Sequence, residues 1–170
     1  MKPMPPCFAR EYQCASEAKT LTLATKVSEY VQAGDLLALK GDLGAGKSTF
    51  ARAFIRSLLA DRLAEVPSPT FTLVQQYDLP DGGNLYHTDL YRLHDSEEVY
   101  ELGLDDERAA AILLVEWPDR LPDDWMQGAL TLDFQIMDGP LESGDPNDDQ
   151  PRRITLSGDA MWASRLEGLC

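Results

Sequence analysis

The stretch "LLALKGDLGAGKSTFARAFIRSLL", residues 36–59, combines three patterns that together predict a fold. It opens with a short apolar run, continues with the pattern G-x-x-x-x-G-K-[ST] at Gly41 to Ser48, and closes with apolar side chains at helical spacing. A strand, a glycine-rich loop and a helix in this order form a cradle for phosphate, because backbone N–H groups and the helix N-terminus face the anion. We therefore predict an α/β fold: a single P-loop NTPase-like domain with a central mixed sheet flanked by helices.

The glycine-rich loop predicts a site for ATP and Mg²⁺. Its glycines allow backbone turns that a Cβ would obstruct. Lys47 is expected to reach the β- and γ-phosphates, and the Ser48 hydroxyl is expected to ligate magnesium. The alternative is a glycine turn with a surface lysine, and the flanking strand and helix argue against it. The predicted nucleotide-binding residues of the loop are Gly41, Asp42, Leu43, Gly44, Ala45, Gly46, Lys47, Ser48 and Thr49.

Two acids at the ends of predicted strands are candidates to complete this site. Asp89 ends the extended stretch "LYHTD", and Glu116 follows the apolar run "AILLV". Magnesium held by a serine and phosphates needs a carboxylate nearby, and ligands of open α/β sheets collect at the carboxyl ends of strands. We assign Asp89 to magnesium, and Glu116 to the attacking water or the metal shell. Alternatively, Asp89 starts a turn or caps a helix, and Glu116 marks where a strand reaches the surface.

The aromatic and imidazole side chains near these acids are less informative. Trp117 could stack on a base or brace Glu116, but the residues alone favour packing, the commoner role of an aromatic side chain at a strand end. His87 and His94 have no cysteine or acid cluster around them at metal-ligand spacing, which argues against zinc.

Composition limits the partners of the chain. A length of 170 residues fits one domain. The formal charge of -14, with no run of four basic residues, argues against strong direct binding to nucleic acid or to an anionic membrane. The three cysteines form no C-x-x-C pair, and the N-terminus lacks the apolar core of a signal peptide, so we expect a cytoplasmic protein.

The rest of the chain predicts further strands and helices around the loop. We expect residues 1–15 to be an N-terminal extension and residues 16–170 to form the P-loop domain. Residues 138–151 are acidic and rich in turn-forming residues, which predicts an excursion. The expected elements are a helix between Ser16 and Gly34, a hairpin of residues 70–77 and 84–93 with its turn at 78–83, a helix over 95–110, strands over 111–117, 129–137 and 152–158, and a closing helix over 159–169.

Four motifs in order carry a resemblance to a known family. With the glycine-rich loop, "SPTFTLVQQY", "HTDLYRL" and "LVEWPDR" all present, the chain resembles the TsaE (YjeE) family of small P-loop ATPases over roughly residues 16–157. Members of that family take part in making threonylcarbamoyladenosine on tRNA, together with the TsaB and TsaD proteins in bacteria. The resemblance implies a magnesium-dependent ATPase that binds the TsaB/TsaD complex and resets it through ATP hydrolysis.

The resemblance also implies roles for single residues. Thr70 in "SPTFTLV" falls in a segment that the family uses as a switch near the γ-phosphate, which makes Thr70 a candidate catalytic residue beside Lys47 and Glu116. Asp89 matches a magnesium-linked aspartate. Glu116 and Trp117 match a functionally important pair, which reverses the packing interpretation of Trp117.

Two further candidates come from the segment "SEAKT". By similarity this segment lies near the adenine, so Glu17 and Thr20 are candidates for contacts with the base. Ser48 stands where threonine is commoner in the family, and it keeps the hydroxyl that magnesium needs.

Three other functions compete with the ATPase. A small-molecule kinase would need an arginine-bearing lid, yet residues 121–151 contain no lysine or arginine. A GTPase would need a guanine reader, and the motif N-K-x-D is absent. A nucleotide-gated binding module with slow turnover stays open. In every case the acidic composition predicts that tRNA contact belongs to partner proteins.

Overall fold

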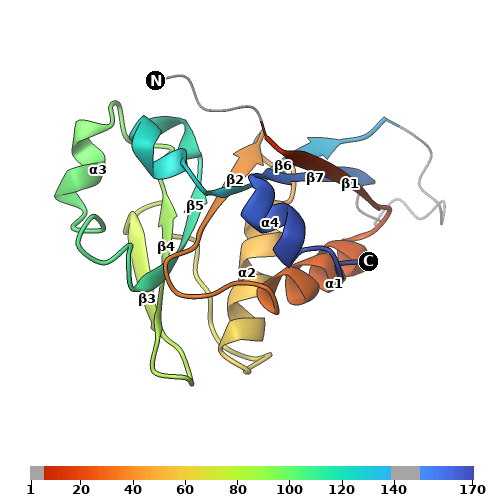
Figure 1. Ribbon diagram of the computed structural model, residues 1–170, viewed down its shortest axis with the longest axis horizontal. Helices are drawn as coiled ribbons and strands as arrows, with labels where there is room; N and C mark the ends of the chain where they lie inside the picture. The colour runs from red at the N-terminus through yellow and green to blue at the C-terminus, as the bar shows by residue number, and fades with distance from the viewer. Residues whose placement is uncertain (1–5, 139–149) are drawn as a thin grey trace.

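The computed structural model describes residues 6–138 and 150–170. Strands and helices follow one another along the chain and gather around one sheet (Figure 1). Their order is β1 (Phe8–Cys14), α1 (Glu17–Ser28), β2 (Leu36–Gly41), α2 (Lys47–Leu58), β3 (Val74–Asp78), β4 (Asn84–Asp89), α3 (Glu97–Glu101), β5 (Ala111–Glu116), η1 (Pro118–Arg120), η2 (Asp123–Met126), β6 (Leu130–Ile136), β7 (Arg152–Gly158) and α4 (Ala160–Arg165).

The strands of the described residues form one mixed sheet in the order β1-β7-β6-β2-β5-β4-β3. Strands β6, β2, β5 and β4 run parallel to their neighbours within this group. Strands β1, β7 and β3 pair antiparallel at the two sides of it. The predicted α/β fold with a mixed sheet is therefore confirmed, and so is the hairpin that β3 and β4 form.

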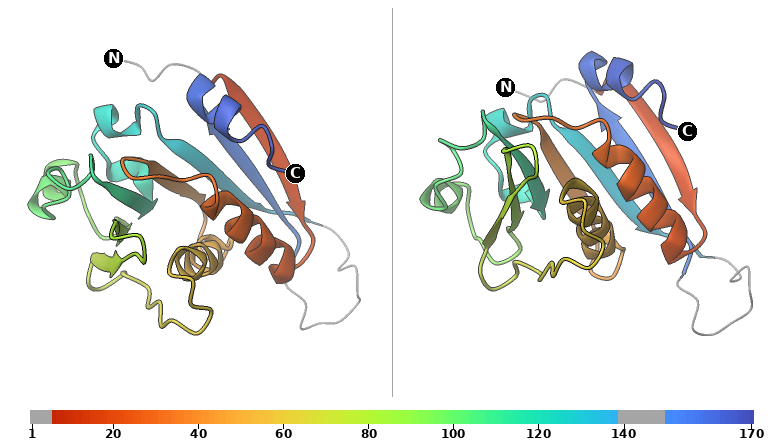
Figure 2. Two further views of the ribbon diagram at one scale, coloured as in Figure 1. Left: turned by 60° about the horizontal axis from the view of Figure 1, so that its bottom comes forward. Right: turned by 90° about the horizontal axis from the view of Figure 1, so that it is seen from below.

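Both faces of the central strands are covered. In β2, Leu37 and Leu39 pack in the cluster that contains α1 and α2, whereas Leu36 and Ala38 pack in a second cluster on the other face. This alternation follows from the period of two in a strand, and it explains why the strand reads as a continuous apolar run. Figure 2 shows the orange α1 and the yellow-brown α2 side by side against one face of the sheet.

Strand β1 lies in the segment that the sequence indicated as an extension. Residues 8–14 pair antiparallel with β7 and form an outer strand of the sheet, so the sheet begins before residue 16. The inward positions are Phe8, Arg10, Tyr12 and the buried Cys14, alternating with exposed residues. The Arg10 guanidinium donates to the carbonyls of Leu166 and Leu169, which ties the strand to the C-terminal segment.

Helix α3 is shorter than predicted. The sequence favoured a helix over 95–110, whereas the structure has only Glu97–Glu101, followed by a turn at Gly103 with φ 73°. The Asp95 carboxylate accepts hydrogen bonds from the N–H groups of Glu97 and Glu98, so it caps the first turn. Glycine in the left-handed region commonly ends a helix, and the polar residues after it form turns instead.

The C-terminal elements also end earlier than expected. The closing helix spans Ala160–Arg165 rather than 159–169, and Asp159 caps it by accepting from the Trp162 N–H at 3.1 Å. Ile136, at the end of β6, is 42% exposed. Most of the acidic segment predicted over 138–151 lies outside the described residues. Within residues 6–138 and 150–170, every helix is too short or too polar to cross a membrane.

Candidate functional site

The glycine-rich loop connects β2 to α2 as predicted. Gly41 closes the strand and Lys47 opens the helix. Gly44 and Gly46 have φ of 79° and 106°, values that side chains disfavour. Gly41 has φ 140°, and a Cβ there would lie 2.6 Å from the Phe134 carbonyl oxygen. The loop can therefore turn back over the helix N-terminus only because these positions are glycines.

Lys47 lies at the centre of the loop. Its ammonium donates to the carbonyl of Gly41 and to that of Asp42 at 2.9 Å, and its side chain is almost fully buried. The same nitrogen lies 4.2 Å from the centre of the Trp117 ring. Burial lowers the pKa of Lys47 below its ordinary value, while Glu116, followed by Asp89 and Asp42, opposes that shift.

The two predicted acids lie side by side. Strands β4 and β5 are parallel, and their register pairs Asp89 with Glu116. Because parallel strands end at the same side of a sheet, both carboxylates reach the side where the glycine-rich loop begins. Glu116 is 3% exposed, so it does not mark where a strand reaches the surface. Asp89 is 5% exposed, and its Oδ1 also accepts from the Tyr91 N–H at 2.9 Å, so this acid starts a turn as well.

Hydrogen bonds join these acids to two predicted hydroxyl residues. The Ser48 hydroxyl donates to Oε2 of Glu116 at 3.3 Å. The Thr70 hydroxyl donates to Oδ2 of Asp89 at 3.1 Å, which links the expected switch segment to the loop side of the sheet. Ser48, Thr70, Asp89 and Glu116 come from four separate parts of the chain, and the fold brings them together at one place.

His87 belongs to this group, although the sequence did not predict it as a site residue. Its Nε2 lies 2.9 Å from Oε1 of Glu116, and both side chains are buried. His87 stands two residues before Asp89 on β4, so a period of two places both on the same face of the sheet. That spacing was the available signal, but only the register of β4 on β5 identifies Glu116 as the partner.

Trp117 packs against the second core cluster and also contacts the glycine-rich loop. It has φ 57° and ψ 58°, a left-handed conformation that is uncommon for a bulky residue and marks a constrained turn after β5. Its ring is half-buried, 5.0 Å from the Tyr91 ring centre and 4.2 Å from the Lys47 ammonium. The packing that the residues alone favoured is therefore confirmed, but that interpretation did not include the contact with the loop lysine.

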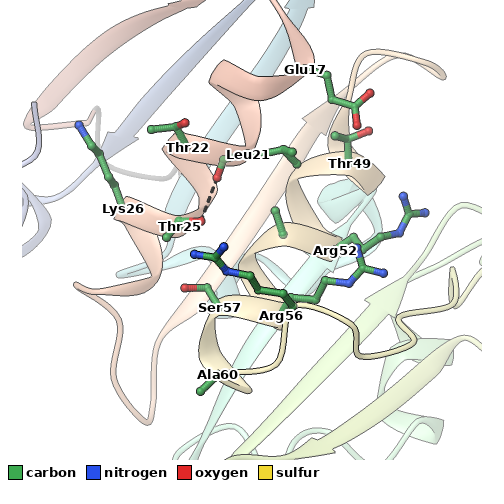
Figure 3. Close-up of a pocket in the computed structure, with 12 residues that line it drawn as sticks. Glu17, Leu21, Thr22, Thr25, Lys26, Thr49, Arg52, Arg56, Ser57 and Ala60 are labelled. Atoms are coloured by element: carbon green, nitrogen blue, oxygen red, sulfur yellow. Dashed lines mark hydrogen bonds between the residues drawn. The ribbon is translucent and has the colours of Figure 1, made fainter.

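The two candidates for base contacts lie in different surroundings. Glu17 and Thr49 both line a groove between α1 and α2, next to the start of α2, where the glycine-rich loop ends (Figure 3). Thr20 lies on the buried face of α1, next to Cys14, and does not line this groove. The structure thus brings Glu17 close to the loop helix but leaves Thr20 facing the core.

The donor set suits magnesium together with a nucleotide. Mg²⁺ prefers oxygen ligands and is commonly held by one or two carboxylates plus substrate phosphates rather than by a cage of side chains. Ser48, Asp89 and Glu116 supply a hydroxyl and two carboxylates at the mouth of the glycine-rich loop. Within residues 6–138 and 150–170 no cluster of three or more histidine, cysteine or acidic side chains could hold a metal by itself. The residues therefore fit a magnesium ion that shares its ligands with bound phosphates.

Comparison with known proteins finds several relatives that share one name. A protein from Rickettsia typhi, named tRNA threonylcarbamoyladenosine biosynthesis protein TsaE, is 38% identical over 104 residues, 61% of this chain and 71% of that protein. A protein of the same name from Bacillus subtilis is 37% identical over 125 residues, 69% of this chain and 74% of that protein. The alignment covers only 58% of the Rickettsia conorii relative, which is also 38% identical.

A solved structure and a family model agree with these relatives. The crystal structure of Bacillus subtilis YdiB superposes with a TM-score of 0.69 at 27% identity, over 95% of this chain and 94% of that chain. The model of the family described as threonylcarbamoyl adenosine biosynthesis protein TsaE matches residues 14–142. That match covers most of the chain, including the loop and both acids, and so this protein belongs to the TsaE family.

Proposed function

We propose that this protein is a magnesium-dependent ATPase that supports threonylcarbamoyladenosine modification of tRNA. The observation that carries the proposal is the convergence of Ser48, Asp89 and Glu116 beside a glycine-rich loop with its lysine. Relatives at 37% to 38% identity bear the name of that pathway. A shared fold alone would leave the chemistry open, but these side chains stand where phosphoryl transfer needs them.

Binding of the triphosphate is assigned to the loop. We assign backbone N–H groups of the glycine-rich loop and of the start of α2 to the phosphate oxygens, while the Ala45 N–H donates to the Asp42 carbonyl within the loop. Lys47 carries the positive charge of this loop, and its buried position makes that charge strong towards a phosphate. Bound magnesium would supply charge neutralisation at the β- and γ-phosphates, with Ser48 and Asp89 as its protein ligands.

Glu116 is assigned to the attacking water. It lies between the hydroxyl of Ser48 and the imidazole of His87, so its two oxygens have fixed orientations. A carboxylate held in this way can accept a hydrogen bond from water and orient it in line with the leaving group. Lys47 stabilises the negative charge that develops on the phosphates.

Thr70 is assigned to a switch that reports the nucleotide. Its hydroxyl is bonded both to Asp89, at 3.1 Å, and to Ser68, at 2.7 Å. Asp89 would hold magnesium in this assignment, so its hydrogen bond with Thr70 would respond to the bound nucleotide and ion. The next residue, Phe71, is 80% exposed, so movement of the segment alters an apolar surface beside the site.

The TsaB and TsaD proteins are the proposed partners. The resemblance and the names of the relatives support this assignment, and ATP hydrolysis would then reset their complex. The exposed Phe71, together with Leu43 at the tip of the loop (70% exposed), offers apolar contacts at the nucleotide side. This observation also favours the second candidate function, a nucleotide-gated binding module with incidental turnover.

Phosphate release separates the candidate functions. The measurement is made on the chain alone, with the TsaB and TsaD proteins, and with small-molecule acceptors in place of partners. Stimulation by the two proteins supports the ATPase that resets a complex. Nucleotide-dependent association without hydrolysis supports the binding module, and phosphate transfer to an acceptor supports a kinase. A chain that neither binds nor hydrolyses ATP contradicts all three.

A further inference from the structure

The groove between α1 and α2 extends beyond the nucleotide side of the molecule. It encloses about 780 Å³, and its lining starts at Glu17 and Thr49 and continues to Lys26 on α1 and Arg62 beyond α2. Between Glu17 and Lys26 alone the helix axis advances about 14 Å at roughly 1.5 Å per residue. Figure 3 shows Arg52 and Arg56 on α2, and Thr22 and Thr25 on the neighbouring α1.

The charge of the groove is opposite to that of the chain. Four of its lining residues are basic, namely Lys26, Arg52, Arg56 and Arg62, and Glu17 at the loop end is its one acid. The whole chain has 15 basic residues against 29 acidic ones, so this concentration of cations stands out. Folding therefore gathers arginines that are scattered in the sequence.

The four cations differ in their contacts within the described residues. Lys26 donates to the Cys170 carbonyl oxygen at 2.8 Å, and Arg56 uses its Nε to bond the Ala64 carbonyl. Across residues 6–138 and 150–170, no carboxylate forms a salt bridge with any of the four. Arg52 and Arg62 are both exposed. Their guanidinium groups can each bind a carboxylate with two parallel hydrogen bonds.

The floor of the groove is apolar. Leu21, which is 39% exposed, lies on α1, and Ala53 and Ala60 lie on the side of α2. The hydroxyls of Thr22 and Thr25 bond carbonyls of their own helix, so they leave the floor without strong donors. An apolar floor with cationic walls matches a segment that has apolar side chains on one face and acids beside them.

RNA fits this groove less well than an acidic protein segment. Single-stranded nucleic acid is commonly held by aromatic rings on which bases stack, and the lining of the groove contains no aromatic residue. The net charge of -14 also opposes a long polyanion at distances beyond the groove. A short acidic segment interacts mainly with the cations of the groove, because salt screens the charges that lie more than about 8 Å away.

We propose that the groove between α1 and α2 is a docking site for an acidic, amphipathic segment of a partner protein. Arg52 and Arg62 bind its carboxylates, and Leu21 with Ala53 and Ala60 receives its apolar side chains. The site shares α2 with the glycine-rich loop, but its occupation needs neither nucleotide nor hydrolysis. The proposal can therefore fail or stand independently of the ATPase function.

The test uses a fluorescein-labelled helical peptide of about 15 residues, with leucines at i, i+3 and i+4 spacing and glutamates elsewhere. Fluorescence anisotropy measures its binding to the full chain without nucleotide, beside a peptide with glutamine in place of glutamate and a single-stranded RNA of equal length. Arg52→Glu and Arg62→Glu are expected to weaken the acidic peptide about fivefold each. Lys19→Glu, an equal charge reversal at an exposed position of α1 outside the groove lining, is the matched control.

The outcomes decide the proposal. Binding that weakens in the two arginine variants, persists in Lys19→Glu and falls with added salt supports it, provided that circular dichroism shows all variants folded. Equal loss in Lys19→Glu, or equal binding of the glutamine peptide, overturns it, because the groove cations would then not be the cause. Absence of peptide binding overturns it as well. Tighter binding of the RNA, lost in the same two variants, would instead assign the groove to nucleic acid.

Discussion

The Nε2 atom of His87 lies 2.9 Å from Oε1 of Glu116, and both side chains are buried. Imidazole and carboxylate come from neighbouring parallel strands, 29 residues apart in the chain. The remaining oxygen of Glu116 accepts from Ser48. A carboxylate with both oxygens held has little freedom to rotate, so His87 is a positioning residue for the acid that we assign to catalysis.

Replacement of His87 tests this relationship. His87→Ala should lower the rate of ATP hydrolysis by about tenfold while leaving nucleotide affinity nearly unchanged, because only the orientation of Glu116 is lost. His87→Gln can place an N–H near the position of Nε2, so it should recover part of the rate. Steady-state kinetics and nucleotide titration give the two quantities. Equal losses in affinity and in rate for both variants would indicate a purely structural histidine.

Lys47 and Glu116 should differ in what their loss removes. Lys47→Ala is expected to weaken ATP binding and abolish turnover, because the positive charge facing the β- and γ-phosphates disappears. Glu116→Ala should retain nucleotide and lose hydrolysis by about a hundredfold or more, because its role arises mainly in the transition state. Calorimetric titration with ATP and a phosphate-release assay separate these effects. Equal loss of binding in both variants would remove Glu116 from its catalytic assignment.

Trp117 should report nucleotide binding through its fluorescence. Its ring lies 4.2 Å from the Lys47 ammonium, and a phosphate that draws the ammonium away changes the surroundings of the indole. Trp125 and Trp162 are buried elsewhere and serve as an internal background. Addition of ATP and magnesium should change the emission of the natural chain, and Trp117→Phe should abolish that change. A full signal in Trp117→Phe would place the sensitive tryptophan elsewhere.

The buried charge of Lys47 is expected to lower the stability of the folded chain. Because burial lowers its pKa from the ordinary 10.5, the folded chain disfavours the charged form that the unfolded chain carries at neutral pH. Lys47→Met should therefore raise the free energy of unfolding at pH 7 by about 1 kcal/mol in the absence of nucleotide. The advantage should shrink as the pH rises towards 10.5, where the unfolded lysine also loses its proton. Denaturant titrations of both chains at pH 7 and near pH 10.5 measure the difference in the free energy of unfolding. A destabilised variant would mean that the bonds to Gly41 and Asp42 outweigh burial.

The site acids could be predicted from the sequence because their positions follow from strand ends. An apolar run that stops at an acid is visible in "AILLVE", and parallel strands share the side at which they stop. His87 could not be assigned a partner in this way. Its contact with Glu116 depends on how β4 is aligned with β5, and alignment across a sheet is a tertiary property that one strand does not encode.

Three other features of the structure could not be predicted from the sequence, each for a different reason. Strand β1 has Arg10 on its inward face and prolines before it, so its alternation is weaker than that of a typical strand. The sequence favoured a long helix after residue 95 because acidic residues suit helices, but Gly103 ends it. The basic groove joins Arg52 and Arg56, one helical turn apart, to Arg62 and Lys26, and only the packing of α1 on α2 brings the four together.

The pairing of Asp89 with Glu116 also limits how this chain can change its length. An inserted or deleted residue between Leu85 and Asp89 would move every following side chain to the opposite face of the sheet and carry the acid away from its neighbour. The turn at residues 79–83 precedes this stretch and is mostly exposed, so extra residues there leave the alignment intact. We therefore expect natural length variation to accumulate in that turn, while the distance along the chain from Leu85 to Asp89 stays constant.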